Sequence, residues 1–218
     1  MKHLCVLLAA ACVWPVAALA QTAVWFENSG ELKQALEAKG DPARGESAFT
    51  ACRACHRKDA SGRPAGPVPR LAGQHANVVV KQLVDIRVGR RSNPSMESFV
   101  GADVLTLASI ADIGAYLQGL PTPATNGKGP GSGIDKGRAL YEKDCVQCHG
   151  ANGEGNAAQF FPMVAAQHYS YLLRETQIIR DGERRNSHPE MVKAIKPYAM
   201  ADLEAVSDYM AQLPPPRK

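Results

Sequence analysis

The 218-residue sequence is poor in aromatic side chains, which make up only 6% of its residues. Because aromatic rings fill much of an ordinary hydrophobic core, we expect the core to need another source of apolar surface. The formal charge of +4 is small, so charge gives no indication of nucleic-acid binding. Beyond residue 20 no hydrophobic run is long enough to span a bilayer, and we expect a mature protein without a transmembrane helix.

The hydrophobic run that does occur lies in residues 1–20. Lys2 precedes it, and the sequence Ala-Leu-Ala ends it at Ala20. This arrangement is typical of a secretory signal peptide with an A-x-A cleavage site, so we predict export to the periplasm and cleavage after Ala20. Lipid attachment at Cys12 is a weaker alternative, because the hydrophobic run before it would be very short.

Cysteine is also scarce, and the four cysteines beyond residue 20 all belong to two C-x-x-C-H motifs, at 52–56 and 145–149. This motif is the signature for covalent attachment of a c-type haem. Two thiols one helical turn apart can each add to a haem vinyl group, and the adjacent histidine reaches the iron as proximal ligand. We therefore predict two covalently bound haem c groups, with these attachment and ligand residues: Cys52, Cys55, His56, Cys145, Cys148 and His149.

Two other kinds of site use C-x-x-C pairs, namely a structural zinc site and a thioredoxin-like redox pair. A zinc site would need both pairs to share one metal. Here each pair has its own histidine, and the motifs lie 93 residues apart. Haem attachment is therefore the favoured interpretation. A haem in each domain would also supply the large apolar body that the core lacks.

The chain repeats itself at the same offset of 93 residues. This offset carries residues 71–75 onto 164–168, and it places Arg184 on Arg91 and Tyr209 on Tyr116. We infer that the sequence contains two copies of one haem domain.

Each copy has the signals of a helical domain. Asp41 as N-cap and Pro42 at the first helical position predict a helix that leads into the first motif. Apolar residues at helical spacing predict a second helix around Val79 and a last helix around Ile113, with counterparts in the second copy. The Gly- and Pro-rich stretch 61–73 and the stretch from Gly89 to Met96 are expected to be loops.

We therefore predict an all-α protein of two tandem domains, 41–119 and 134–218, joined by a Gly/Pro-rich linker at 120–133. Residues 21–40 precede the first domain as an extension. Their apolar spacing predicts a short helix packed on the first domain, and a partner-docking arm is the weaker alternative.

The sixth iron ligand separates electron transfer from small-molecule chemistry, because a methionine thioether raises the potential and closes the iron to other ligands. Met96 is the only methionine in the first copy after the leader, so we predict it as that ligand. In the second copy Met191 follows a similar arginine-rich loop and is predicted likewise. Its offset from Met96 is 95 rather than 93, which a two-residue insertion in the loop explains.

Bis-histidine ligation is the alternative, because His75 and His168 match in the repeat. Both stand at expected helix starts, where a capping or surface role is more common. His188 has no counterpart, and we expect it to be solvated. Met200 and Met210 belong to the last helix and are interpreted as packing residues.

Two further expectations concern residues around the ligands. A backbone carbonyl near Pro69 and another near Pro162 should accept the second ring N–H of each proximal histidine and fix its tautomer. Arg91 and Arg184 are candidates to pair with haem propionates, although an arginine in a polar loop is as often solvated.

The paired motifs, the sequence Pro-Arg-Leu-Ala-Gly-Gln at 69–74 and the Gly89-x-Arg91 pattern resemble the bacterial di-haem cytochrome c4 family. Members of that family are tandem class I cytochromes c, and the resemblance covers about 41–213. It implies histidine and methionine ligation in each domain and haems that lie close across the interface. Two features depart from the family pattern, namely Arg57 after the first motif, where a small residue is usual, and the extension at 21–40.

We predict a periplasmic electron carrier without catalytic residues, acting between a dehydrogenase or quinol-oxidising complex and a terminal oxidase or other acceptor. Its partners would be redox proteins, with no nucleic acid and no membrane contact of its own. The alternatives are a cytochrome subunit of a periplasmic dehydrogenase complex and a di-haem enzyme of the peroxidase or thiosulfate dehydrogenase type. The enzyme would need an open or thiolate-ligated iron. No cysteine is left for that role, and both copies offer a methionine.

Overall fold

The computed structural model of the chain describes residues 25–26 and 29–216. The predicted signal peptide lies outside the described residues. Within them the regular structure is helical, and strand pairing is limited to an isolated bridge between Asn156 and Phe161. The predicted all-α class is confirmed. No described helix combines the length and apolar character that a bilayer crossing requires.

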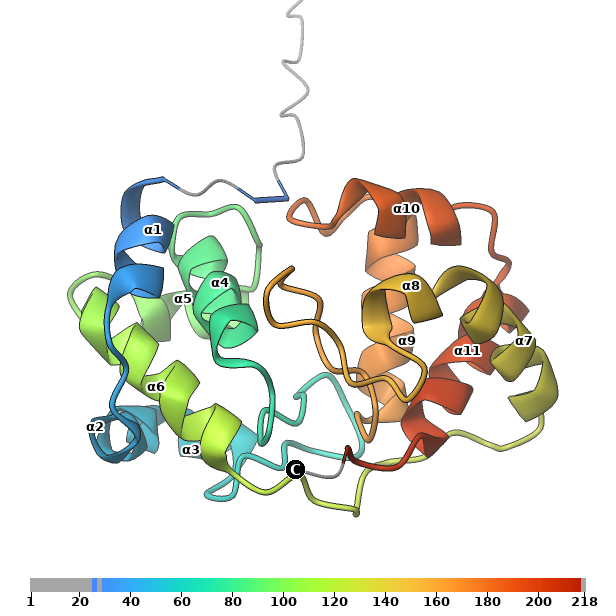
Figure 1. Ribbon diagram of the computed structural model, residues 1–218, viewed down its shortest axis with the longest axis horizontal. Helices are drawn as coiled ribbons and strands as arrows, with labels where there is room; N and C mark the ends of the chain where they lie inside the picture. Colours follow the sequence, from blue (N-terminus) through green and yellow to red (C-terminus); the bar gives the residue numbers. More distant parts are fainter. Residues whose placement is uncertain (1–24, 27–28, 217–218) are drawn as a thin grey trace, which may run out of the picture.

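Two helical units lie side by side, the blue-to-green part of the chain and the yellow-to-red part (Figure 1). The first unit contains α1 (Gly30–Glu37), α2 (Pro42–Ala48), a 3-10 turn (Phe49–Cys52), α3 (Arg53–His56), α4 (Ala76–Arg87), α5 (Pro94–Val100) and α6 (Leu107–Gly119). The second contains α7 (Ile134–Asp144), α8 (Val146–His149), α9 (Tyr169–Arg180), α10 (Pro189–Ile195) and α11 (Met200–Gln212). Apart from α1, each helix of the first unit has a counterpart in the second.

Each unit has its own hydrophobic core, built on its last helix. Helix α6 packs against α2 and α4, and α11 packs against α7 and α9 in the same way. The apolar stripe of α6 includes the fully buried Ile110 and Leu117, and that of α11 includes Leu203 and Val206. The predicted periodicity of the last helices is therefore confirmed, and the tandem arrangement with it.

The start of α2 shows how local sequence positions the first motif. The Asp41 side chain accepts a hydrogen bond from the Arg44 N–H at 2.8 Å, and Pro42 occupies the first helical position, as predicted. The Asp41 N–H and the Arg44 guanidinium in turn both donate to Asp112 on α6, at 2.7–2.8 Å. The helix that leads into the attachment motif is thus tied to the core helix.

The loop predicted from Gly89 to Met96 is shorter than expected, because α5 begins at Pro94. The predicted end of the loop is therefore wrong. A proline after Asn93 is a favourable helix start, since proline at the first position loses no hydrogen bond. Met96 is the third residue of α5, and Met191 is the third residue of α10, which begins at Pro189. The two-residue insertion in the second unit therefore precedes α10, and the methionines occupy equivalent helical positions.

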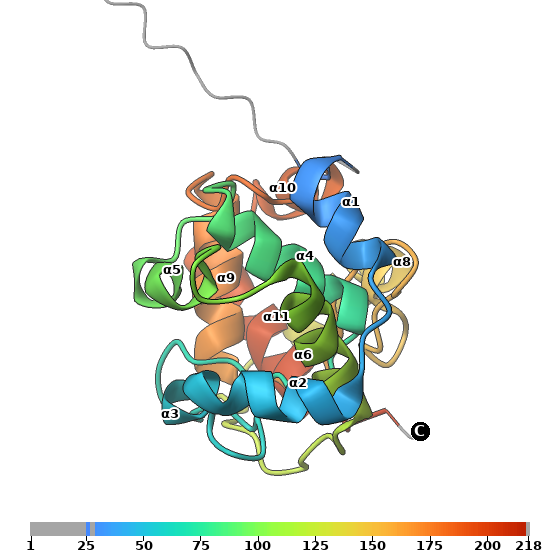
Figure 2. The same cartoon turned by 90° about the vertical axis from the view of Figure 1, so that its left-hand side faces the viewer.

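The described part of the extension folds onto the first unit as predicted. Helix α1 packs against α4 and α6 and buries Leu32 and Ala35 in the first core (Figure 2). Trp25, which precedes α1, contacts both units. Its ring lies 4.1 Å from the Lys81 ammonium of the first unit and 5.2 Å from the His188 ring of the second.

Candidate haem-binding sites

One continuous cavity of about 610 Å³ extends through both units. Apolar side chains of α4, α5 and α6 line it in the first unit, and those of α9, α10 and α11 line it in the second. Seven of the eight predicted site residues are among its lining, namely Cys52, His56, Met96, Cys145, Cys148, His149 and Met191. The eighth, Cys55, is exposed on the outer side of the first motif.

The two motif histidines have the same environment. His56 Nδ1 lies 3.2 Å from the Pro69 carbonyl oxygen, and His149 Nδ1 lies 3.0 Å from that of Pro162. The expected carbonyl acceptors are therefore confirmed. Burial lowers the pKa of both imidazoles, and the hydrogen bond to the carbonyl only partly opposes this effect. Each ring is neutral with Nδ1 donating, the tautomer that leaves Nε2 available to a metal.

The two predicted thioether ligands reach the same cavity as these histidines. Met96 packs against the first core and Met191 against the second. The other second-unit methionines have different surroundings. Met210 is buried as expected, whereas Met200 is 42% exposed, so its interpretation as a packing residue is wrong. Its sulfur accepts a hydrogen bond from Gln177 at 3.0 Å.

His75 and His168 stand at the N-cap positions of α4 and α9, which agrees with the expected helix starts. Their side chains make no capping hydrogen bond and instead connect the two units, so the expected role of the side chains is wrong. His75 Nε2 donates to the Glu154 carbonyl at 2.9 Å, and His168 Nε2 donates to the Ser61 carbonyl at 2.8 Å. The remaining nitrogen of His168 accepts the Gly127 N–H at 3.0 Å. Both His168 nitrogens are therefore engaged by the protein, which argues against bis-histidine ligation.

His188 was expected to be solvated, but it is only partly exposed and makes specific contacts. It is the N-cap of α10, and its Nδ1 accepts the Glu190 N–H at 3.1 Å. Its ring makes edge contacts with Trp25 and Phe161 at 5.2 and 5.4 Å. Because these aromatic partners lie outside its own helix, the local sequence gave no signal of the cluster.

The interface between the units is self-complementary, as in a two-fold dimer. The Gln74 side chain accepts the Met163 N–H at 2.9 Å and donates to the Met163 carbonyl at 3.0 Å. The Gln167 side chain makes the same pair of bonds with Arg70, both at 2.9 Å. These glutamines are equivalent in the repeat, as are Arg70 and Met163. The sequence carried this signal, but not which residues meet.

Arg91 and Arg184 also converge at the interface instead of being solvated. Arg91 contacts Gln82 at 2.9 Å and Glu175 at 3.2 Å, and Arg184 contacts the same two side chains at 3.0 and 2.6 Å. Gln82 and Glu175 are themselves equivalent in the repeat. Although burial alone would raise it, Arg184, Arg91 and Arg174 hold the pKa of Glu175 below its ordinary value. We call these four side chains (Gln82, Arg91, Glu175 and Arg184) the arginine quartet.

A third arginine, Arg70, is buried without a carboxylate partner among the described residues. Only 1% of it is exposed, and its guanidinium donates to the carbonyls of Ala165 and Ala166 at 2.7 and 2.9 Å. Burial lowers the pKa of Arg70 to about 10. Arg70 and Arg91 are buried and Arg184 is 14% exposed, so the cavity lining holds these three guanidinium groups but only one buried carboxylate, that of Glu175. Buried charges need partners, so the cavity fits a large apolar cofactor that carries carboxylates, as haem does.

The thiols have the wrong character for a thioredoxin-like redox pair, which depends on a lowered thiol pKa. Burial instead raises the pKa of Cys52 and Cys148, and it raises that of Cys145 to about 12.

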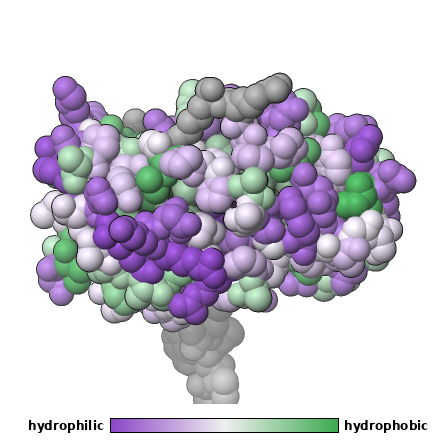
Figure 3. Space-filling view, turned by 90° about the horizontal axis from the view of Figure 1, so that it is seen from below, coloured by the Kyte–Doolittle hydropathy of each residue, from purple (hydrophilic) through white to green (hydrophobic). Residues whose placement is uncertain are grey.

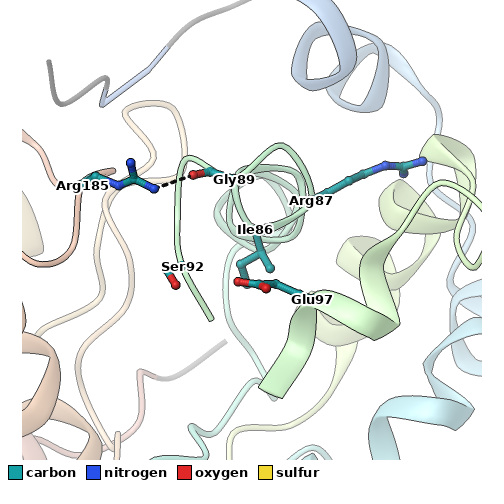
Figure 4. Close-up of a pocket in the computed structure, with 6 residues that line it drawn as sticks. All are labelled: Ile86, Arg87, Gly89, Ser92, Glu97 and Arg185. Atoms are coloured by element: carbon teal, nitrogen blue, oxygen red, sulfur yellow. Dashed lines mark hydrogen bonds between the residues drawn. The ribbon is translucent and has the colours of Figure 1, made fainter. Parts of the chain in front are cut away.

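A smaller hollow lies at the end of α4 (Figure 4). There Arg185 of the second unit donates to the Gly89 carbonyl at 3.0 Å, while Arg87 points away from it. Because its polar groups do not converge, we regard this hollow as part of the contact between the units.

The second unit matches the family model for cytochrome c over residues 134–214. A cytochrome c4 of Stutzerimonas stutzeri is 32% identical over 197 residues, which cover 81% of this chain and 90% of the relative. The chain belongs to the di-haem cytochrome c4 family. It therefore carries two covalently bound haem c groups, and its role is electron transfer.

Two further likenesses extend this result. The crystal structure of reduced cytochrome c4 from Pseudomonas stutzeri matches with a TM-score of 0.73 at 27% identity, over 80% of this chain and all of that one. The thiosulfate dehydrogenase electron acceptor of Stutzerimonas stutzeri strain A1501 is 33% identical over 214 residues, which cover 92% of this chain and 94% of the relative.

Proposed function

We propose that the protein is a periplasmic carrier that accepts electrons from an oxidising enzyme of the thiosulfate dehydrogenase type and passes them to a further redox protein. The length of chain over which the similarity to an electron acceptor extends supports this proposal. The alignment with the thiosulfate dehydrogenase electron acceptor covers 92% of this chain, and the 8% that it leaves out is too short to exclude residues 21–40. The alignment with cytochrome c4 covers a smaller share of this chain, 81%. The described part of the extension is also an integrated part of the fold, since α1 and Trp25 pack on the units.

In this proposal the motif cysteines, Cys52 and Cys55 in the first unit and Cys145 and Cys148 in the second, hold the haems by thioether bonds. When bound, each haem supplies an iron that alternates between the ferric and ferrous states. His56 and His149 would each hold an iron through Nε2, with their rings oriented by the carbonyls of Pro69 and Pro162.

Met96 and Met191 are the sixth ligands in the proposal. A thioether favours the reduced state and excludes small molecules from the iron. The chain supports this role by placing each methionine in the first turn of a helix that begins with proline. With His56 and Met96 holding one iron and His149 and Met191 the other, the protein would pass electrons and would perform no substrate chemistry.

The buried arginines complete the sites. Arg70, Arg91 and Arg184 line the cavity, and we assign them as partners of the haem propionates. Positive charge at low dielectric also opposes the further positive charge of the ferric state, so these residues should raise both reduction potentials.

A rapid-mixing experiment tests the proposed function. The oxidised protein is mixed with a thiosulfate dehydrogenase and thiosulfate, and the ferrous haem absorption is followed. We expect both haems to be reduced only when enzyme and thiosulfate are both present. If the enzyme does not reduce the protein, although ascorbate reduces both haems, the proposed donor is wrong.

Two outcomes would point to the alternative functions. Steady oxidation of thiosulfate or peroxide by the protein alone would show a di-haem enzyme. Stable co-purification with a dehydrogenase would instead show a dedicated cytochrome subunit.

A further inference from the structure

The two haem-attachment segments have opposite charge although they are copies of one design. Residues 53–63 contain four basic residues and one acidic residue, whereas residues 146–156 contain one acidic residue and no basic residue. At the 93-residue offset the four basic positions of the first segment are occupied by uncharged residues in the second, namely Arg53 by Val146, Arg57 by Gly150, Lys58 by Ala151 and Arg63 by Asn156.

Three of these basic side chains follow an exposed point of attachment within eight residues along the chain. Arg57, Lys58, Arg63 and the attachment residue Cys55 are all exposed. Arg63 donates to the Ala54 carbonyl at 3.0 Å, which holds its guanidinium on the attachment turn. We call Arg57, Lys58 and Arg63 the basic surface.

Little within the protein neutralises the basic surface. Among the described residues, no carboxylate forms an ion pair with Arg57 or Lys58, whereas Arg53 is paired with Glu46 at 3.3 Å. Asp59 is the acidic group in the segment, and its carboxylate accepts the Ser61 N–H at 3.1 Å. Hydrogen bonds from Ser61 and the charge of Arg57 hold the pKa of Asp59 below its ordinary value, so it stays ionised and offsets one positive charge.

The second attachment segment offers no such surface. Cys148 is only partly exposed, and the Glu154 carboxylate accepts the Asn152 N–H at 2.9 Å. Helices α3 and α8 also lie well apart in two perpendicular views (Figures 1 and 2). Seen from the side on which α3 lies, the most hydrophilic patch is over the first unit, and further hydrophilic patches lie over the second unit (Figure 3). The basic surface is therefore a feature of one end of the molecule.

We propose that the basic surface is the docking site for a redox protein with an acidic face, and that electrons pass between that partner and the first haem. Opposite charges at such faces speed association and orient the partner. The exposure of Cys55 allows the partner to approach the attached edge of the cofactor. One electron crosses per encounter, one cofactor is oxidised as the other is reduced, and no proton or group is transferred.

This inference rests on the proposed carrier function, but its test does not involve thiosulfate or a dehydrogenase. The probe is a plastocyanin with an acidic surface, and its affinity for the holoprotein is measured by calorimetry at low and high salt. The test variant combines Arg57→Gly and Lys58→Ala, which introduce the residues found at the equivalent positions of the second unit. The control variant combines Lys39→Ala and Lys136→Ala, which remove two exposed positive charges elsewhere.

We expect the test variant to bind plastocyanin at least about fivefold more weakly at low salt, and the control to change less than about twofold. At high salt the difference should shrink, because screening acts on exposed charges. The rate of electron transfer to plastocyanin should fall in parallel, while the absorption spectrum stays unchanged.

Three results would overturn the inference. Equal weakening in both variants would show that only net charge matters. Unchanged binding in the test variant would place the docking site elsewhere. Binding of the holoprotein to phosphatidylglycerol vesicles through the same residues, without affinity for plastocyanin, would show that the basic surface meets a membrane. Failure of the thiosulfate experiment with intact plastocyanin docking would refute only the proposed donor.

Discussion

The two units follow the same backbone path with different side chains. Arg57 adopts φ 67° directly after the first motif, and Gly150 adopts φ 79° at the equivalent position after the second. The reverse exchange occurs where Gly73, at φ 78°, corresponds to Ala166, at φ 52°. Only glycine adopts such angles without strain. The backbone geometry at both positions was therefore retained even where the side chain disfavours it.

The contacts between the units were retained as well, whereas the outward faces diverged. Gln74 and Gln167 make the same backbone contacts across the interface, and His75 and His168 each reach a carbonyl of the other unit. At the surface, by contrast, the basic surface of the first unit has no equivalent in the second. The comparison teaches that duplication here preserved the interior and specialised the exterior.

The largest expected effect breaks the equivalence of the two iron sites. Met96→Ala and Met191→Ala should each remove about half of the far-red sulfur-to-iron band, because each deletes one of two thioether ligands. The corresponding potential should fall by on the order of 0.1 V or more. Absorption spectroscopy and potentiometric titration measure both. Retention of the full band in both variants would refute the assignment of these methionines.

The next effect concerns the arginine quartet, whose carboxylate lies in the second unit. Glu175→Gln should destabilise the folded protein at pH 7 by about 3–5 kcal/mol, because it removes the buried carboxylate of the protein that Arg91 and Arg184 share. In the unmutated protein the pKa of Glu175 is lower in the folded than in the unfolded state. The carboxylate therefore stabilises the fold at pH values above the ordinary pKa of 4.5, and this stabilisation is lost as the pH falls through the lower pKa of the folded state. Denaturation at several pH values should therefore show that the unfolding free energies of the unmutated protein and the Glu175→Gln variant converge at acidic pH.

A swap of the two side chains sharpens this comparison. Adding Gln82→Glu to the Glu175→Gln variant moves the carboxylate to the equivalent position of the first unit. Because both arginines contact both side chains, most of the lost stability should return. No recovery would mean that the two positions are not interchangeable.

A smaller effect tests the extension, which only the first unit has. Trp25→Ala should cost about 1–3 kcal/mol, less than the loss of a fully buried aromatic residue, because the ring is only partly buried. The mutation removes contacts with Lys81 and His188 together. Phe26→Ala, at a neighbouring ring that is 37% exposed, serves as the control and should cost less. Thermal unfolding of the holoproteins measures the difference.

The smallest effect exchanges the residues after the two motifs. Arg57→Gly should stabilise the first unit by about 1 kcal/mol, because glycine relieves the strain of its positive φ. Gly150→Ala should destabilise the second, since an added Cβ would also clash with the Glu154 side chain. Equilibrium denaturation measures the change in unfolding free energy for each variant, and the two changes should have opposite signs. Destabilisation by Arg57→Gly would mean that the Arg57 side chain makes a stabilising contribution larger than the strain.

Many local features were predictable because their signals lie within a few residues. The cap at Asp41, the apolar stripes of the last helices and the repeat offset were all confirmed, and so were the carbonyl acceptors of the motif histidines. The start of α5 was missed although its signal was local, since Pro94 after Asn93 marks a helix start. The predicted domain boundaries and the two methionine ligands remain predictions.

The sequence by itself therefore determined the all-α class, the duplication and the two attachment motifs, because each depends on spacing along the chain. Only the tertiary structure decided what His168, Arg70 and Glu175 do. Each of them has a partner in the other unit, between 84 and 107 positions away in the sequence. Burial and pairing across an interface depend on which surfaces meet, and no linear pattern in one chain specifies that.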